Sequence, residues 1–320
     1  MRILTGIQPS GIPHIGNYFG AIRQTVEMQN KGENFLFIAD YHALTTYPKA
    51  EDLRSNVMNL ALSWLACGVD PERTVFFRQS DIPEVCELSW ILSTFSPVGL
   101  MERAHSYKDK VAKGFEANCG LFTYPILMSA DILLYRANLV PVGKDQKQHL
   151  EIARDLAIKF NNRFGDILTI PEGYIPDQVA IVPGVDGQKM SKSYNNTIPI
   201  FDKEKALRKV IMSVVTDSKG LEEPKDPDTC NVYALYKLVA TPEELQEMRE
   251  RMMAGNYGYG HAKQALFEKL WAYFEPMRKR REELENNLDY VRDLLKQNGE
   301  KARNEAAILL SKVREAVGLR

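Results

Sequence analysis

The chain has 320 residues, 44% of them hydrophobic and 26% charged, as in folded globular proteins of about two domains. Its 41 basic and 42 acidic residues give a net charge of −1, so any nucleic-acid surface must be a local patch. The four cysteines lie far apart without a C-x-x-C pair, which argues against a zinc ribbon and indicates a reducing compartment. The first apolar run is too short for a signal peptide, and no run of about 18 apolar residues predicts a membrane span, so we expect a cytoplasmic protein.

The first half of the chain alternates short β-rich runs with amphipathic stretches. We expect strands at 2–7, 35–44, 74–80 and 139–143, and helices at 16–30, 51–68 and 147–165. Strands that alternate with helices of this length are joined by crossovers and form a parallel sheet. The predicted fold class is therefore α/β with a Rossmann-like parallel sheet, and ligands of such sheets bind beyond the carboxyl ends of the strands.

The second half is predicted to be helical, because no strand pattern follows residue 197. Helices are expected at 241–255 and across 261–317, with a break at Gly299. We therefore expect a Rossmann-like catalytic domain at 1–197 and an all-helical domain at 198–320.

The first predicted strand leads into the loop "GIQPSGIPHIGN" at 6–17. Ile12 and Pro13 stand where a P-loop has lysine and serine or threonine, and G-x-G-x-x-G is absent too. What remains is a Gly-rich turn into a helix near Gly16, which aims free N–H groups and a positive dipole at an anion. Gly16 allows a close approach, and His14 and Asn17 offer neutral polar contacts. Taken alone, the loop is explained equally well as an ordinary turn between a strand and a helix.

A second loop, "GQKMSKS" at 187–193, has neither helical nor strand periodicity. It pairs Lys189 and Lys192 with two serine hydroxyls. Most loops of this composition are simply solvated, so the loop needs a partner elsewhere in the chain to carry a function.

"PHIGN" at 13–17 and "KMSKS" at 189–193 together resemble the paired signatures of the class I aminoacyl-tRNA synthetases. Asn17 stands where most of that class has histidine, which is typical of its tryptophanyl branch. Further segments that resemble this branch are "GIQPSG" at 6–11, "YPILMSADILLY" at 124–135 and "VPVGKDQKQHLE" at 140–151. The resemblance thus extends in order over essentially the whole chain.

The resemblance implies a reaction in which the carboxylate of tryptophan attacks the α-phosphate of ATP and pyrophosphate leaves. Such a reaction needs no protein nucleophile, and the sequence has no Ser-His-Asp or Cys-His constellation. Lys189 and Lys192 would stabilise the leaving group, each by roughly 3–4 kcal/mol, from a flexible loop that closes after the substrates bind. The implied partners are ATP with Mg²⁺, L-tryptophan, tRNA(Trp) and a second copy of the chain. The helical domain would bind the anticodon end, with its last helices packed back on the catalytic domain.

The resemblance also assigns individual residues. The implied ATP site consists of Gln8, Pro9, Ser10, His14, Gly16, Asn17, Gly143, Lys144, Asp145, Ile181, Val182, Lys189, Met190, Ser191, Lys192 and Ser193. Gln8 joins Lys189 and Lys192 as a catalytic residue. The Asp145 carboxylate would accept from the ribose hydroxyls, and Ile181 or Val182 would give adenine a backbone contact.

The implied tryptophan site contains the acidic residue of an otherwise apolar segment. Tyr124, Met128 and Asp131 are spaced to lie on one face of a helix. Burial of a lone carboxylate is costly, so Asp131 either pairs with an arginine from elsewhere or accepts the indole N–H while Met128 packs the ring. Tyr124 and Gln146 would hold the substrate ammonium. His42 is either a pocket residue or a hydrogen-bonded structural histidine.

Some relatives of this branch hold an iron–sulfur cluster with four cysteines of the helical domain. Here Cys230 has a counterpart, but Met252, Tyr259 and Ala262 stand at the other three places. We therefore expect neither an iron–sulfur cluster nor zinc.

Three other functions remain open. The same fold could charge tyrosine, because an aspartate accepts a phenol hydroxyl as well, although "KMSKS" and "MSADILLY" favour tryptophan. The chain could be a non-catalytic paralogue that binds nucleotide or RNA, against which the retained Lys189, Lys192, Gly16 and Asp131 argue. A nucleotidylyltransferase would share the turn but would not need a helical second domain.

Overall fold

The structure is a computed structural model that describes residues 1–102, 107, 112, 114, 116–143, 146–174 and 181–319. Its strands are β1 (Arg2–Ile7), β2 (Glu33–Ile38), β3 (Thr74–Arg78), β4 (Leu139–Pro141) and β5 (Glu172–Tyr174). The helices of the first half are α1 (Ile15–Asn17), α2 (Arg23–Met28), α3 (Asp40–Ala43), α4 (Ala50–Ala66), α5 (Glu84–Ser93), α6 (Val98–Glu102), α8 (Cys119–Leu134) and α9 (Lys147–Phe164). Those of the second half are α10 (Glu204–Met212), α11 (Asn231–Tyr236), α12 (Pro242–Ala254), α13 (Tyr259–Tyr273), α14 (Glu275–Glu285) and α15 (Leu288–Val317).

The five strands form one parallel sheet in the order β3-β2-β1-β4-β5. The predicted α/β class is confirmed, and the predicted strands at the positions of β1, β3 and β4 are present. The short strand β5 was not predicted. The strand order reverses between β1 and β4, and in open parallel sheets this switch point is where ligands bind.

Both faces of the sheet are buried, as a parallel sheet requires. Side chains alternate along a strand, so neighbours in sequence enter different cores. Leu36 and Phe76 join the cluster that contains α1 and α4, whereas Phe35 and Phe77 join the cluster that contains α5, α8 and α9. The central strands therefore consist of nearly continuous apolar residues.

The prediction of a strand at 35–44 was wrong beyond Ile38. β2 ends there and the chain turns into the short helix α3. The last sheet bond on this side runs from the Ala39 N–H to the Ile7 carbonyl at 2.8 Å, and β1 itself ends at Ile7. Beyond that point no neighbouring strand offers partners, so the apolar residues at 39–44 form a helical turn instead.

The prediction of a break at Gly299 was also wrong, because Gly299 lies inside the continuous helix α15. A Cβ at this position would lie 3.1 Å from a carboxylate oxygen of Asp81 and 3.2 Å from its Cβ. The glycine therefore permits close packing of α15 against the loop after β3. Along its length α15 contributes Val291 to the first core cluster and Val313 to the second.

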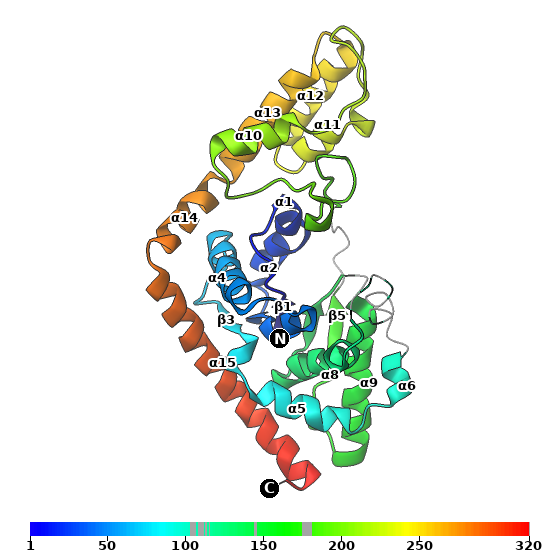
Figure 1. Cartoon of the computed structure of the whole chain (residues 1–320), viewed down its shortest axis with the longest axis vertical. Helices are drawn as coiled ribbons and strands as arrows, with labels where there is room; N and C mark the ends of the chain where they lie inside the picture. The colour runs from blue at the N-terminus through cyan, green and yellow to red at the C-terminus, as the bar shows by residue number, and fades with distance from the viewer. Residues whose placement is uncertain are drawn as a thin grey trace.

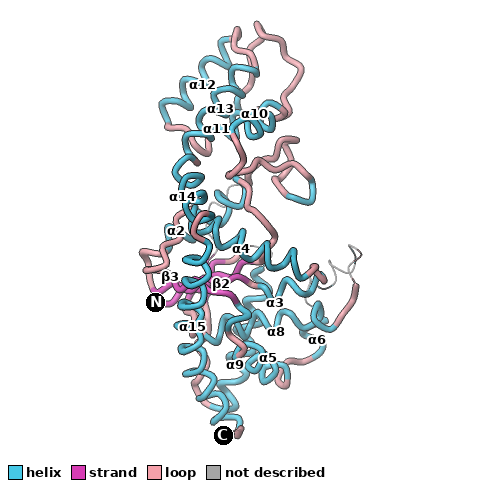
Figure 2. The backbone as a smooth tube through the Cα atoms, turned by 60° about the vertical axis from the view of Figure 1, so that its left-hand side comes forward, coloured by secondary structure: helices cyan, strands magenta, loops and turns pink. Residues whose placement is uncertain are grey.

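The helices of the second half extend away from the sheet. Figure 1 shows α10, α11, α12 and α13 at one end of an elongated molecule, while α15 runs along the flank of the sheet to the other end. Figure 2 shows the strands near the middle, beside α15. Arg281 of α14 is buried, and it donates to the Ser63 hydroxyl of α4 at 2.6 Å. In the described parts of the chain, no helix has the length and apolarity needed to cross a membrane.

Candidate functional site

The site lies where the loop after β1 meets the start of the following helix. His14 and Asn17 form a reciprocal cap: the His14 ring Nδ1 accepts from the Asn17 N–H at 3.3 Å, and the Asn17 side-chain oxygen accepts from the His14 N–H at 3.1 Å. The expected helix is present, since α1, a π-helical turn at Tyr18–Ile22 and α2 follow one another. The two polar residues of "PHIGN" thus start the helix by bonding each other.

The His14 imidazole is held neutral by its surroundings. Burial, with a further contribution from the positive charge of Lys192, lowers its pKa to about 4. A neutral ring is what the cap needs, because Nδ1 must accept a hydrogen bond. Burial also lowers the pKa of the Lys192 ammonium.

The two signature segments, far apart in the sequence, are in direct contact. The Lys192 ammonium donates to the Ser10 carbonyl at 2.6 Å. A Cβ on Gly16 would lie 3.2 Å from the Cβ of Met190, and one on Gly11 would lie 3.4 Å from the Lys192 ammonium. Gly11 also has a φ of 88°, which favours glycine. These glycines let the loop at 187–193 dock on the loop after β1, as Figure 1 shows beside α1.

A neighbouring backbone pairing fixes the approach of this loop. The Ile15 N–H donates to the Ile198 carbonyl at 3.0 Å, and His14 bridges to Pro199. The segment after the loop thus pairs with the start of α1.

The loop itself is ordered by one buried side chain, Asn196. Its oxygen accepts from the Ser191 N–H at 2.7 Å, and its amide group donates to the Asp186 carboxylate at 2.8 Å and to the Lys189 carbonyl at 3.2 Å. Sequence reasoning missed Asn196, which carries no charge and lies outside the signature. Its role depends on contacts that only the folded loop creates.

The remaining predicted residues of this group differ in exposure. The Val182 carbonyl accepts from the buried Met190 N–H at 2.9 Å, and Ile181 is 75% exposed. The side chains of Gln8, Asn17, Lys189, Lys192 and Ser193 are exposed, and Pro9 is buried. Gly143 follows β4 and its carbonyl accepts from the Gln146 N–H at 3.0 Å. Lys144 and Asp145 lie outside the described residues.

A second group of predicted residues surrounds the Asp131 carboxylate. Asp131 is only 2% exposed, and His42 Nε2 lies 2.9 Å from its Oδ2. The Gln79 amide nitrogen donates to both carboxylate oxygens at 2.9 Å. Among the described residues this carboxylate is therefore bound by a histidine and a glutamine, and not by the arginine of the alternative. Burial raises the pKa of Asp131, while the hydrogen bonds from His42 and Gln79 oppose the rise.

Tyr124 joins this group through a shared histidine. Its hydroxyl and His149 Nε2 are hydrogen-bonded at 2.9 Å, and its ring meets the His42 ring edge-on at 6.1 Å. Met128 is partly buried and packs against the second core cluster. The Gln146 side chain is exposed at the start of α9.

Gln79 and His149 are functional candidates that sequence reasoning did not single out. Gln79 directly follows β3, so its place at the carboxyl end of a strand was an available signal. His149 lies within the segment 140–151, but neither its residue type nor its spacing there forms a distinctive pattern.

The chain was compared with known families and proteins. The family "tRNA synthetases class I (W and Y)" matches residues 1–275. A tryptophan--tRNA ligase of Fusobacterium nucleatum is 54% identical over 99% of this chain and 98% of that protein. One of Rhodopirellula baltica is 53% identical over the full length of both. A crystal structure of tryptophanyl-tRNA synthetase from Campylobacter jejuni with ADP and tryptophan superposes with a TM-score of 0.96 at 52% identity, covering 99% of this chain and 100% of that one.

We predict that the His14 ring titrates near pH 4 rather than at its ordinary 6.5. The unfolded chain takes up this proton first, so the stability contributed by neutral His14 falls as the pH drops from about 6.5 to about 4. NMR titration of the ring, assigned with His14→Gln, measures the midpoint. Lys192→Met should raise it because a nearby positive charge is removed, whereas Lys203→Met should leave it unchanged. A midpoint near 6.5 in the wild type would contradict the buried, accepting ring.

Proposed function

The chain belongs to the class I tRNA synthetases for tryptophan and tyrosine, and from this membership we propose that it attaches tryptophan to tRNA(Trp) at the expense of ATP. The observation that carries the mechanism is the contact between the two signature loops through Lys192 and Ser10. It joins the candidate leaving-group cations to the loop at the carboxyl end of β1. The tyrosyl alternative loses its support, because full-length relatives above 50% identity are tryptophan--tRNA ligases.

The reaction has two steps. The tryptophan carboxylate attacks the α-phosphorus of ATP, an aminoacyl-adenylate forms, and pyrophosphate leaves. A hydroxyl of the terminal ribose of tRNA then attacks the adenylate carbonyl, and AMP leaves with the electron pair of the mixed anhydride. Mg²⁺ enters with ATP as part of the substrate. The protein contributes position and charge rather than a nucleophile.

Lys189 and Lys192 stabilise the charge that develops on the leaving pyrophosphate. Lys192 is held against the Ser10 carbonyl, a weak neutral partner that a phosphate oxygen can replace. Lys189 is exposed and free to turn toward the same group. The neutral His14 nearby adds no competing positive charge. Closing of the loop over bound ATP completes the site.

Asp131 selects the amino acid through the ring nitrogen. A carboxylate has about four acceptor directions, and within the described part of the chain His42 and Gln79 occupy three of them. One acceptor remains for the indole N–H, while Met128 packs against the ring. Tyr124, supported by His149, and Gln146 bind the substrate ammonium.

The residues at the places of the iron–sulfur ligands do not fit a four-thiolate site. Cys230, Met252 and Ala262 are buried in one apolar core cluster, and the Tyr259 hydroxyl donates to Asp217 at 2.7 Å. These places supply one thiol among apolar side chains. Among the described residues, no three histidine, cysteine or acidic side chains gather as a metal-binding group.

We also propose that the active protein is a homodimer, as the resemblance implies. Supporting features are three large apolar side chains on neighbouring elements: Leu44 is 50% exposed, Tyr47 is 66% exposed and Trp90 of α5 is 71% exposed. Leu44, Tyr47 and Ser89, which precedes Trp90, line one pocket of about 530 Å³. An apolar surface of this kind is stabilised when a partner covers it.

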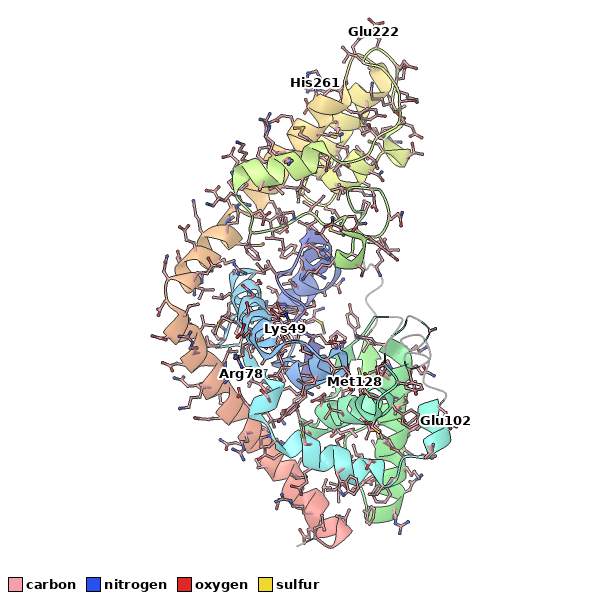
Figure 3. All side chains as sticks on the ribbon, in the orientation of Figure 1. Lys49, Arg78, Glu102, Met128, Glu222 and His261 are labelled. Atoms are coloured by element: carbon pink, nitrogen blue, oxygen red, sulfur yellow. The ribbon has the colours of Figure 1, made fainter. Side chains whose placement is uncertain are left out.

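The helical end of the molecule is proposed to bind the anticodon end of tRNA. A pocket of about 580 Å³ near the end of α12 is lined by Arg251, Tyr257 and His261, and the two rings stack at 5.9 Å. His261 lies at the helical end of the molecule, well away from Met128 (Figure 3). Stacked aromatic rings beside an arginine are suited to an unstacked base. Removal of the whole helical half is a poor test, because Tyr18 and Phe19 share their core with Phe274.

We predict that tryptophan alone among the twenty amino acids supports rapid exchange of labelled pyrophosphate into ATP. The exchange reports adenylate formation without tRNA, so it tests the first step directly. A parallel charging assay with total tRNA tests the second. Equal exchange with tyrosine would replace the proposed substrate, and no exchange with any amino acid would favour a non-catalytic role.

Lys192→Met should slow adenylate formation by about 10²-fold or more, the usual cost of losing one stabilising group at a developing charge. Tryptophan affinity should stay close to that of the wild type, because the ammonium acts on the leaving group. Single-turnover kinetics separate the two quantities. Lys203→Met, a nearby exposed lysine, is the control. A rate within a few-fold of wild type would disprove the role of Lys192.

Tyr257→Ala should weaken tRNA charging while leaving pyrophosphate exchange unchanged. Loss of one stacked base is expected to raise the KM for tRNA at least about fivefold. Tyr290→Ala removes a tyrosine of α15 that is 42% exposed and serves as the matched control. An unchanged KM in Tyr257→Ala would show that this pocket does not contact tRNA.

A further inference from the structure

Gln79 is a buried polar residue whose amide is bound to the Asp131 carboxylate. It directly follows β3, begins the short helical turn at Gln79–Asp81, and is 1% exposed. A buried amide must have hydrogen-bond partners, so its contacts define what it does.

The orientation of the Gln79 amide is set by its own environment. Its oxygen accepts from the backbone N–H groups of Tyr41 at 3.1 Å and His42 at 3.4 Å. These N–H groups lie at the start of α3, whose N-terminus has no side-chain cap of its own. Because the amide oxygen must face these two donors, its nitrogen must face Asp131. The residue therefore connects three elements: the end of β3, the start of α3 and helix α8.

The bonds to Asp131 differ between its two oxygens. Oδ2 accepts from both His42 and Gln79, whereas Oδ1, as far as the described residues go, accepts from Gln79. His42 by itself touches a single oxygen and would let the carboxylate rotate. A donor that reaches both oxygens at 2.9 Å holds the plane of the carboxylate in place.

We propose that Gln79 is a positioning residue for amino-acid selection, which holds the Asp131 carboxylate so that the free acceptor direction of Oδ1 meets the indole N–H. The inference rests on the proposed function, specifically on Asp131 as the reader of the ring nitrogen. It adds that Oδ1 of Asp131 is the atom that accepts from the ring N–H, and that Gln79 holds this atom in position. A carboxylate free to rotate would meet the ring nitrogen poorly and would discriminate less between amino acids.

The test compares tryptophan with 3-(benzothiophen-3-yl)alanine, in which sulfur replaces the ring N–H in a ring system of nearly the same shape. The kcat/KM ratio of the two in pyrophosphate exchange measures recognition of the N–H. Gln79→Met keeps the length of the side chain but cannot donate a hydrogen bond. We expect the ratio to fall about tenfold or more, the equivalent of one hydrogen bond to a charged group. The KM for tryptophan should rise, while kcat and the KM for ATP change by less than a few-fold.

Gln29, the residue that follows α2, provides a matched control because it binds the opposite end of β3. It too is a buried glutamine with four side-chain bonds: its amide donates to the carbonyls of Val26 and Gly68, and its oxygen accepts from the Asp70 N–H and the Thr74 hydroxyl. Thr74 begins β3, so the two glutamines hold opposite ends of one strand. Gln29→Met should lower the melting temperature as Gln79→Met does but keep the wild-type ratio.

Each outcome decides between the claims. If Gln79→Met shows the same kcat/KM ratio as the wild type, the inference is overturned, while Asp131 is still the residue that recognises the ring N–H. If the wild-type protein itself shows a ratio near one, Asp131 does not recognise the ring N–H, and the inference fails with that assignment. If Gln79→Met does not fold, Gln79→Glu keeps the acceptor for the two backbone N–H groups and places a like charge against Asp131. It should lower the ratio as well, and an unchanged ratio would again overturn the inference.

Discussion

The hydrogen bond from the Lys192 ammonium to the Ser10 carbonyl joins two residues that lie 182 positions apart in the sequence. It can form only because the backbone approaches closely at two glycines. At Gly16 a Cβ would crowd both the Met190 Cβ and the His14 ring, and at Gly11 the chain takes a positive φ. The proposed ATP site therefore depends on the lack of a side chain at these two glycines as much as on charge. A side chain at either position would displace the lysine loop from the loop that follows β1.

The proposed site also depends on hydrogen bonds that stabilise a buried carboxylate. Asp131 is enclosed by apolar helices, and desolvation alone favours its protonated form. His42 and Gln79 oppose this from the carboxyl ends of two neighbouring strands. The same arrangement that keeps the carboxylate able to accept also limits its free acceptor direction to one. In the proposed site, the same three hydrogen bonds that stabilise the carboxylate would also serve selectivity.

The helical half is coupled to the sheet by shared cores instead of a flexible linker. Phe274 packs with Tyr18 and Phe19, and Arg281 donates into α4. α15 then continues past Gly299 along the sheet, where Arg303 pairs with Glu84 at 2.8 Å. The π-helical turn at Tyr18–Ile22, just after the loop that follows β1, lies in the same core cluster as Phe274 of the helical half.

Local pattern in the sequence determined the α/β class, the position of most strands and helices, and the two glycine- and lysine-containing loops, because these depend on periodicity and on residues close in the chain. The resemblance then identified Lys192, Asp131, Tyr124 and His42 as members of a site. What local pattern could not determine was the end of β2 at Ile38 or the continuity of α15 at Gly299. Both depend on whether a neighbouring segment offers hydrogen-bond partners or close packing, which the local sequence does not record.

The roles of the supporting side chains in the site follow from tertiary structure alone. Gln79 and Asn196 are uncharged, belong to no motif, and acquire their roles only where strands and loops distant in sequence converge. The partner of Asp131 likewise could not be read from the chain, because histidine, glutamine and arginine all satisfy a carboxylate. The sequence determined which groups are present and which loops carry them. The fold decided which donor faces which acceptor, because hydrogen bonds depend on distance and direction in space.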